Sequence, residues 1–225
     1  MIKLLSIADL ISLINACFGF LAILILLSDF TPFELRIRLS FSFILLALLA
    51  DGLDGVIARK TRTGELGDYL EAMADMTSMG IAPSVFVYMV YYEMVSAALQ
   101  TALIIILILF VVCSFIRLSS FHLLKKETYY VGIPASASTI FLLIASFLEI
   151  ELPYTLLFIV VLSFATISHI RFPKPGLKVD TIAATLIVLT IAMGKFYYNV
   201  APLLLFSALA VYSIVGPFYV RKSIS

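Results

Sequence analysis

Four acidic residues lie between long apolar stretches of the sequence: Asp51, Asp54, Glu71 and Asp75. Ionisable groups are costly at the depth of an apolar segment, so these four indicate a functional site rather than a structural one. At about 100° per residue, Asp51 and Asp54 share one face of a helix, and Glu71 and Asp75 share a face of the next helix. We expect the two faces to converge if these helices are antiparallel neighbours.

Carboxylate oxygens are the ligands that Mg²⁺, Mn²⁺ or Ca²⁺ prefer, whereas zinc and copper favour nitrogen and sulfur. Four carboxylates that face one another repel, and bound cations would compensate that repulsion. Two metal ions about 4 Å apart can clamp the attacking and leaving oxygens of a phosphoryl transfer. The pattern therefore predicts a site for one or two divalent ions, with a phosphorylated substrate.

Two other interpretations of the carboxylates stay open. They could form a structural ion-pair network with the basic residues Arg59, Lys60 and Arg62. They could instead belong to an ion-coupled transporter, although the sequence shows no inverted repeat.

The composition is that of a polytopic helical membrane protein, with 63% hydrophobic and 13% charged residues and a mean hydropathy of +1.14. The formal net charge of +1 gives no indication of nucleic-acid binding. Cys17 and Cys113 lie in apolar stretches and predict no disulfide framework.

Hydropathy predicts an all-α transmembrane bundle of about eight spans in a single domain, residues 1–225. The first span carries Asn15, whose amide needs a partner inside the bundle, and residues 1–9 form a short interfacial lead-in. The predicted spans are about 10–27, 38–60, 68–92, 96–117, 131–148, 152–168, 182–193 and 200–219.

The basic residues predict how these spans are oriented. With eight spans, one side of the membrane receives 12 of the 15 Lys and Arg residues and the other side 3. Cytoplasmic loops carry such an excess, so both termini and the carboxylates are expected on the cytoplasmic side of the cell membrane. The 12 residues are Lys3, Arg59, Lys60, Arg62, Arg117, Lys125, Lys126, Arg171, Lys174, Lys178, Arg221 and Lys222.

The carboxylates form part of a longer motif, which resembles that of the CDP-alcohol phosphotransferases. The family pattern is Asp-x2-Asp-Gly-x2-Ala-Arg, a spacer, and then Gly-x3-Asp-x3-Asp. Residues 51–59, Asp-Gly-Leu-Asp-Gly-Val-Ile-Ala-Arg, match the first half at every defined position. The second half is Gly67-x3-Glu71-x3-Asp75, in which Glu71 replaces the third aspartate and the spacer is one residue short.

Three further segments resemble those of the phosphatidylserine and archaetidylserine synthases of this family. They are Thr77 to Pro83, Tyr130 to Ala135, and Ile167 to Pro173. Their order and spacing agree, so the resemblance covers most of the chain.

The resemblance implies transfer of a phosphatidyl-type group from a CDP-lipid to the hydroxyl of L-serine, with release of CMP. It implies Mg²⁺ or Mn²⁺, in two ions, and Asp75 as the general base. The metal ligands would be Asp51, Asp54, Glu71 and Asp75. The residues that contact the CDP-lipid would be Asp54, Gly55, Ala58, Arg59 and Gly67. The lipid is CDP-diacylglycerol or CDP-archaeol, and the family's frequent dimers are compatible with a homodimer.

The acceptor's carboxylate needs a fixed cation, and Arg117 is the first candidate, with Ser78 as a further acceptor-binding residue. Arg117 would equally suit snorkelling to the lipid surface. Glycerol phosphate or inositol phosphate remain alternative acceptors for the same chemistry.

Overall fold

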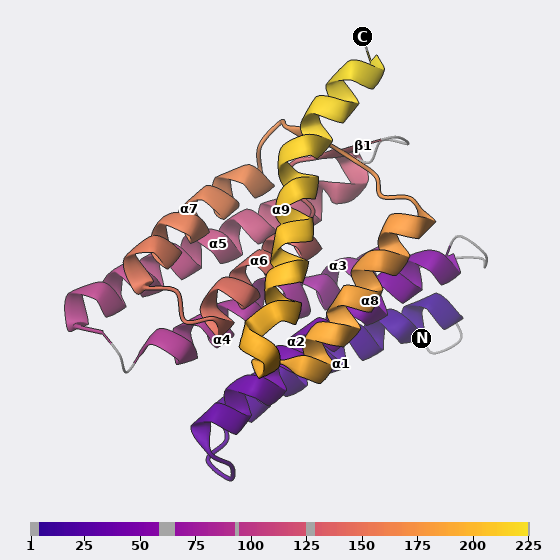
Figure 1. The fold of residues 1–225 in the computed structure, drawn as a ribbon. Helices are drawn as coiled ribbons and strands as arrows, with labels where there is room; N and C mark the ends of the chain where they lie inside the picture. The colour runs from indigo at the N-terminus through magenta and orange to yellow at the C-terminus, as the bar shows by residue number, and fades with distance from the viewer. Residues whose placement is uncertain (1–4, 59–65, 93–94, 125–128, 225) are drawn as a thin grey trace. The chain divides into compact units, whose positions relative to one another are not determined.

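The computed structural model describes residues 5–58, 66–92, 95–124 and 129–224. Within these ranges the chain forms eight helical segments, one for each predicted span, and a short two-stranded ribbon (Figure 1). The all-α prediction is therefore confirmed. The helices are α1 (Ile7–Leu27), α2 (Phe33–Ala58), the continuous α3 (Gly67–Asp75), η2 (Met76–Ile81) and α4 (Ala82–Tyr91), then α5 (Ala97–Leu124), α6 (Ala135–Phe147), α7 (Leu152–Thr166), α8 (Leu177–Met193) and α9 (Phe196–Ile224).

Four of the described helices are long and apolar enough to cross a membrane: residues 7–27, 67–91, 97–120 and 196–221. The helices α6 and α7 are apolar but shorter. Large apolar side chains such as Ile105, Ile108 and Ile116 of α5 are more than half exposed. Apolar groups that face outward on helices of this length are typical of an integral membrane protein.

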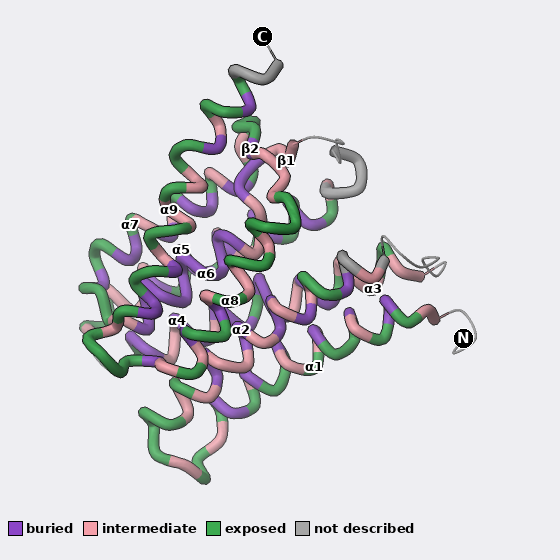
Figure 2. Tube along the Cα trace, turned by 45° about the vertical axis from the view of Figure 1, so that its right-hand side comes forward, coloured by how far each residue is buried: buried purple, intermediate pink, exposed green. Residues whose placement is uncertain are grey.

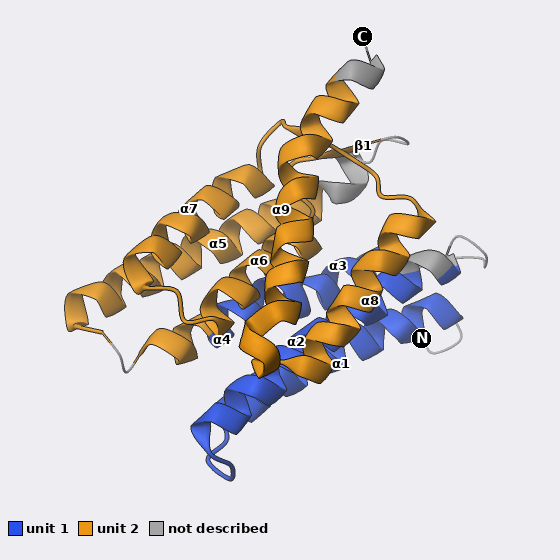
Figure 3. Ribbon diagram, in the orientation of Figure 1, with its two compact units in different colours: residues 1–86 blue, residues 87–225 orange. Residues whose placement is uncertain are grey.

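The chain divides into two compact units, residues 1–86 and 87–225 (Figure 3). The expectation of a single domain over residues 1–225 stays a prediction.

In the first unit, α1 and α2 lie side by side as a helical hairpin (Figures 1 and 2). A capping box begins α1: Ser6 Oγ accepts from the Asp9 backbone N–H at 3.2 Å, and Asp9 Oδ2 accepts from the Ser6 N–H at 2.7 Å. This box satisfies two otherwise unpaired donors of the first turn. The helix therefore begins at Ile7, and the predicted start at Leu10 was wrong by three residues.

Buried residues recur every three or four positions along α1 and form one face of the helix (Figure 2). This face contacts α2, α3 and η2. The closest approach is at Gly19, where an added Cβ would lie 2.7 Å from Ser78 Cα. Glycine at position 19 thus permits the contact between α1 and η2.

The segment η2 is a π-helical turn that starts directly after Asp75. The Ala82 backbone N–H donates to the Thr77 carbonyl, five residues earlier. Hydropathy did not predict this turn, because an average over apolar residues does not record which carbonyl each backbone N–H bonds to. Such π turns inside α-helices are frequent at functional sites.

In the second unit, α5 packs against α7, and α9 packs against α6 and α8. Phe141 of α6 makes edge contacts with Phe158 of α7 at 5.8 Å and with Phe206 of α9 at 5.0 Å between ring centroids. Almost every residue of α6 is buried. This helix is therefore central to the apolar core of the second unit.

A ribbon of β1 (Tyr129–Val131) and β2 (Arg171–Pro173) pairs antiparallel, with Tyr130 opposite Phe172. Gly132 follows with φ +77°, and a Cβ there would clash with the Thr166 carbonyl oxygen. The predicted helix from Val131 was therefore wrong at its start, since the chain becomes helical only at Ala135. The ribbon brings together the Tyr130–Ala135 and Ile167–Pro173 segments.

Candidate active site

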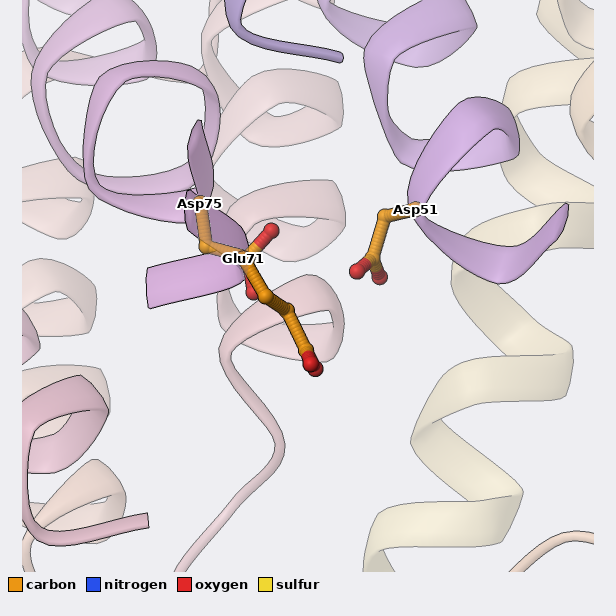
Figure 4. A group of neighbouring side chains, drawn as sticks. All are labelled: Asp51, Glu71 and Asp75. Carbon is orange, nitrogen blue, oxygen red and sulfur yellow. The ribbon is translucent and has the colours of Figure 1, made fainter. Parts of the chain in front are cut away.

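The acidic faces of α2 and α3 meet, as expected from the spacing. Carboxylate oxygens of Asp51, Glu71 and Asp75 all lie within 4.8 Å of one another. Figure 4 shows Asp51 on one helix, Glu71 and Asp75 on the other, and the three carboxyl groups in the space between. Asp51 and Glu71 are half-buried and Asp75 is 8% exposed. The extra methylene of Glu71 thus does not keep it out of the cluster.

The fourth predicted ligand, Asp54, lies on α2 one turn after Asp51 and is also buried. It does not belong to the group of three carboxylates within 4.8 Å. Its Oδ2 accepts a hydrogen bond from Ser12 Oγ of α1 at 2.6 Å. Its role as a metal ligand stays a prediction.

Asp75 is held from a different direction. Asn15 of α1 donates from Nδ2 to Asp75 Oδ1 at 2.9 Å, and the Asn15 side chain is fully buried. The Asn15 amide thus has a hydrogen-bond partner inside the bundle, as we expected from its place in an apolar span. That partner, Asp75, is the predicted general base.

The arrangement fits a divalent cation. Three carboxylates this close together, one of them buried and two half-buried, repel one another unless a positive charge is present. All the candidate ligand atoms are oxygens, and Mg²⁺ binds oxygens at about 2.1 Å, which suits a cluster of this size. The structure thus supports a hard-cation centre formed by Asp51, Glu71 and Asp75.

The predicted substrate-contacting residues lie next to this centre in the chain. Gly55 and Ala58 lie in the last turns of α2, and Gly67 begins α3. Arg59, and with it the alternative ion-pair network of Arg59, Lys60 and Arg62, lies outside the described residues.

The two predicted acceptor-binding residues are both buried. Ser78 lies in η2 of the first unit, and its Oγ donates to the Ala74 carbonyl at 3.1 Å. Arg117 lies on α5 of the second unit and is 6% exposed. Charged side chains are seldom buried to this extent unless they are paired. The acceptor-binding roles of Ser78 and Arg117 stay predictions.

The sequence analysis identified Asn15 as needing a partner in the bundle, but it missed Ser12 and Gly19 and did not connect α1 to the carboxylates. Ser12, Asn15 and Gly19 fall at i, i+3 and i+7, which places two polar side chains and a close-contact glycine on one face. That spacing was a usable signal in an otherwise apolar helix. The spacing did not indicate that Asp54 and Asp75 are the hydrogen-bond partners, because those partners lie 42 and 60 residues further along the chain.

The chain is similar to proteins of known family and activity. Residues 5–214 match the model of the family described as CDP-alcohol phosphatidyltransferase. The CDP-diacylglycerol–serine O-phosphatidyltransferase of Methanocaldococcus jannaschii is 31% identical, over 76% of this chain and 76% of its own. The archaetidylserine synthase of Methanothermobacter thermautotrophicus is 31% identical, over 76% of this chain and 72% of its own. The Bacillus subtilis CDP-diacylglycerol–serine O-phosphatidyltransferase is 29% identical, over 58% of this chain and 72% of its own.

Proposed function

Because the chain belongs to the CDP-alcohol phosphatidyltransferase family, we propose that it transfers a phosphatidyl-type group from a CDP-lipid to the hydroxyl of L-serine and releases CMP. The observation that carries this proposal is the meeting of Asp51, Glu71 and Asp75 at motif spacing. The serine acceptor is supported by the names of the relatives, which cover about three quarters of the chain. Family membership also argues against the ion-coupled transporter.

We assign the metal centre to Asp51, Asp54, Glu71 and Asp75, with two ions, Mg²⁺ or Mn²⁺. When bound, these ions neutralise negative charge on the phosphoryl oxygens of the substrate. The chain's own contribution is to gather the carboxylates from two helices and to hold Asp54 and Asp75 by hydrogen bonds from α1.

Asp75 is assigned as the general base. In the proposed reaction its carboxylate takes the proton of the serine hydroxyl, and the serine oxygen forms a bond to the lipid-side phosphorus. The bond from that phosphorus to the oxygen of CMP breaks, so CMP leaves with the bonding electrons. A positioned base of this kind contributes about 10²- to 10⁴-fold to rate.

Binding of the CDP-lipid is assigned to the motif residues Asp54, Gly55, Ala58, Arg59 and Gly67. For the acceptor, we assign the serine carboxylate to Arg117 and a hydrogen bond to Ser78. A buried guanidinium recognises a planar carboxylate with two parallel hydrogen bonds, which lysine cannot reproduce. Replacing Arg117 with Lys should therefore raise the KM for serine while leaving the KM for CDP-lipid unchanged.

The apolar helices and the lipid substrate indicate a protein of the membrane. From the distribution of Lys and Arg we propose that both termini and the active site face the cytoplasm. The chain could act as a homodimer. Cross-linking in native membranes would test this, and accessibility of cysteines introduced near each terminus would test the orientation.

The decisive experiment measures CMP release by the purified full chain in detergent, with CDP-lipid and Mg²⁺ or Mn²⁺. L-serine, glycerol 3-phosphate and inositol 1-phosphate are offered in parallel. Release with serine alone is expected. Release with one of the phosphorylated acceptors would keep the metal centre and replace the acceptor. Absence of release with all three would contradict the proposed function.

A further inference from the structure

The first helix contributes the polar contacts that hold the carboxylates in place, although the family motif lies entirely outside it. Asn15 is fully buried, and its Nδ2 donates to Asp75 Oδ1 at 2.9 Å. Its own Oδ1 is also buried and has no hydrogen-bond partner among the described residues. A buried acceptor without a partner destabilises the folded state, so an apolar side chain would serve α1 better if packing were all that mattered.

The rest of α1 places Asn15 where this contact is possible. Gly19, four residues on, allows α1 to approach the backbone of η2 so closely that a Cβ would lie 2.7 Å from Ser78 Cα. Ser78 is three residues after Asp75, on the π turn that begins there. The backbone contact at Gly19 and the amide contact at Asn15 therefore fix the same short segment.

We propose that Asn15 is a positioning residue for Asp75. The amide holds Oδ1 of Asp75 and so restricts rotation of the carboxyl group, which orients the other oxygen for its role in the centre. Hydrogen bonds to ligating carboxylates typically change metal affinity or activity by about 10- to 100-fold when they are removed. The inference rests on the proposed function only for its turnover measurement, because the hydrogen bond and the cluster exist irrespective of the substrate.

The test uses the full chain in detergent and Mn²⁺ as the probe, without lipid or serine. Mn²⁺ affinity is measured by electron paramagnetic resonance, and CMP release is measured separately. For Asn15→Ala, we expect Mn²⁺ affinity to fall about 10- to 100-fold and kcat to fall by a similar factor. The KM for CDP-lipid should stay within about twofold, because the motif residues that contact it are unchanged.

Asn15→Asp is the second variant, since it keeps the size of the side chain and replaces the donor with an acceptor. It should lose turnover at least as fully as Asn15→Ala. Ser40→Ala is the matched control: Ser40 is also fully buried in the first unit, and its Oγ also lacks a partner among the described residues. It lies 11 residues before Asp51 on α2, about 16 Å along the helix. It should leave both readouts unchanged.

A double-mutant cycle separates positioning from general damage. If Asn15 acts through Asp75, then Asn15→Ala should change Mn²⁺ affinity very little in a chain that already carries Asp75→Ala. Additive losses in the cycle, unchanged Mn²⁺ affinity in Asn15→Ala, or failure of both Asn15 variants to fold would each overturn the inference. If the unchanged protein binds Mn²⁺ but releases no CMP with serine, the proposed function fails while the Mn²⁺ cycle still decides the role of Asn15.

Discussion

The two units differ in whether their buried polar side chains form hydrogen bonds to another helix. In the second unit, buried hydroxyls mostly bond to a carbonyl of their own helix: Ser114 to Phe110, Ser163 to Ile159, Thr166 to Leu162 and Thr190 to Leu186. In the first unit, Ser78 and Ser84 also bond to carbonyls of their own continuous helix. Ser12 and Asn15 differ, because their side chains bond across helices, to Asp54 and Asp75. All the buried acidic side chains among the described residues, Asp9, Asp54 and Asp75, lie in the first unit.

This difference indicates where stability and where chemistry are located. A hydroxyl that bonds to its own helix satisfies itself locally and places no demand on the neighbouring helix. A hydrogen bond between helices fixes the orientation of a functional group but depends on both partners. Tyr91 of the second unit is an exception, since its hydroxyl donates to the Ile150 carbonyl at 2.6 Å, and it joins helix to loop without involving a charge.

The largest effect should come from Asp75→Asn. The amide has nearly the same shape and can still accept from Asn15, so the fold should survive, but it cannot take a proton. We expect kcat to fall about 10²- to 10⁴-fold, with binding of CDP-lipid largely retained. Turnover and CDP-lipid binding are measured on the same preparation.

If Asp75→Asn instead failed to fold, the role of Asp75 would be structural. The difference between the two units would then no longer indicate that the chemistry is located in the first unit. Turnover close to that of the unchanged protein would remove Asp75 as the base.

Removal of the metal ions should have the next largest effect. Chelation should abolish CMP release, and it should also lower the thermal midpoint, because a ligand that binds only the folded state stabilises it by about 2.7 kcal/mol at 100 times its Kd. Scanning calorimetry or a thermal shift with and without Mn²⁺ checks this. In Asp51→Asn the shift should shrink, since one carboxylate of the cluster is lost. An equal Mn²⁺ shift in Asp51→Asn would place the ion elsewhere.

Much of this fold could be predicted from the sequence, because apolar segments of about 20 residues are strong signals in a membrane protein. The ends were harder. The capping box at Ser6 and Asp9 started α1 earlier than hydropathy indicated, and pairing of Tyr130 with Phe172 kept residues 131–134 out of a helix. Both errors come from local hydrogen bonds, which an average of hydropathy along the sequence does not record.

The site was predictable to the extent that its residues were close in sequence. Asp51, Glu71 and Asp75 lie on two successive helices that are close in sequence, so periodicity was enough to predict that they meet. Ser12 and Asn15 reach the same site from 42 and 60 residues away. Their helical spacing was visible, but their partners depend on how α1 packs against α3 and η2, which one sequence does not give.

A smaller effect is expected from the close contact at Gly19. In Gly19→Ala, the new Cβ would meet the Ser78 backbone at 2.7 Å, so α1 and η2 must separate. Overpacking of this kind costs about 1–3 kcal/mol, and turnover should fall because Asn15 moves away from Asp75. Gly52→Ala is the control, because nothing lies within 4 Å of a Cβ at position 52 of α2. It should be neutral or stabilise by up to about 1 kcal/mol.

Thermal midpoints in detergent compare the two glycine variants directly. Equal midpoints and equal turnover in both would mean that the contact between α1 and η2 is not needed for the site.

The smallest expected loss of turnover, and the sharpest comparison, come from one substitution made in both units. Ser12→Ala and Ser163→Ala each remove a buried hydroxyl, at 4% and 0% exposure. Ser163→Ala should lower the free energy of unfolding by about 0.5–1.5 kcal/mol, and Ser12→Ala, which loses a bond to a carboxylate, by about 1.5–3 kcal/mol. Turnover should separate them. Ser163→Ala frees only the Ile159 carbonyl of its own helix, so its rate should be unchanged. Ser12→Ala leaves Asp54 without its 2.6 Å donor, so its rate should fall about 10-fold or more. Equal rates would show that hydrogen bonds between helices in the first unit serve packing alone, as those within helices do in the second.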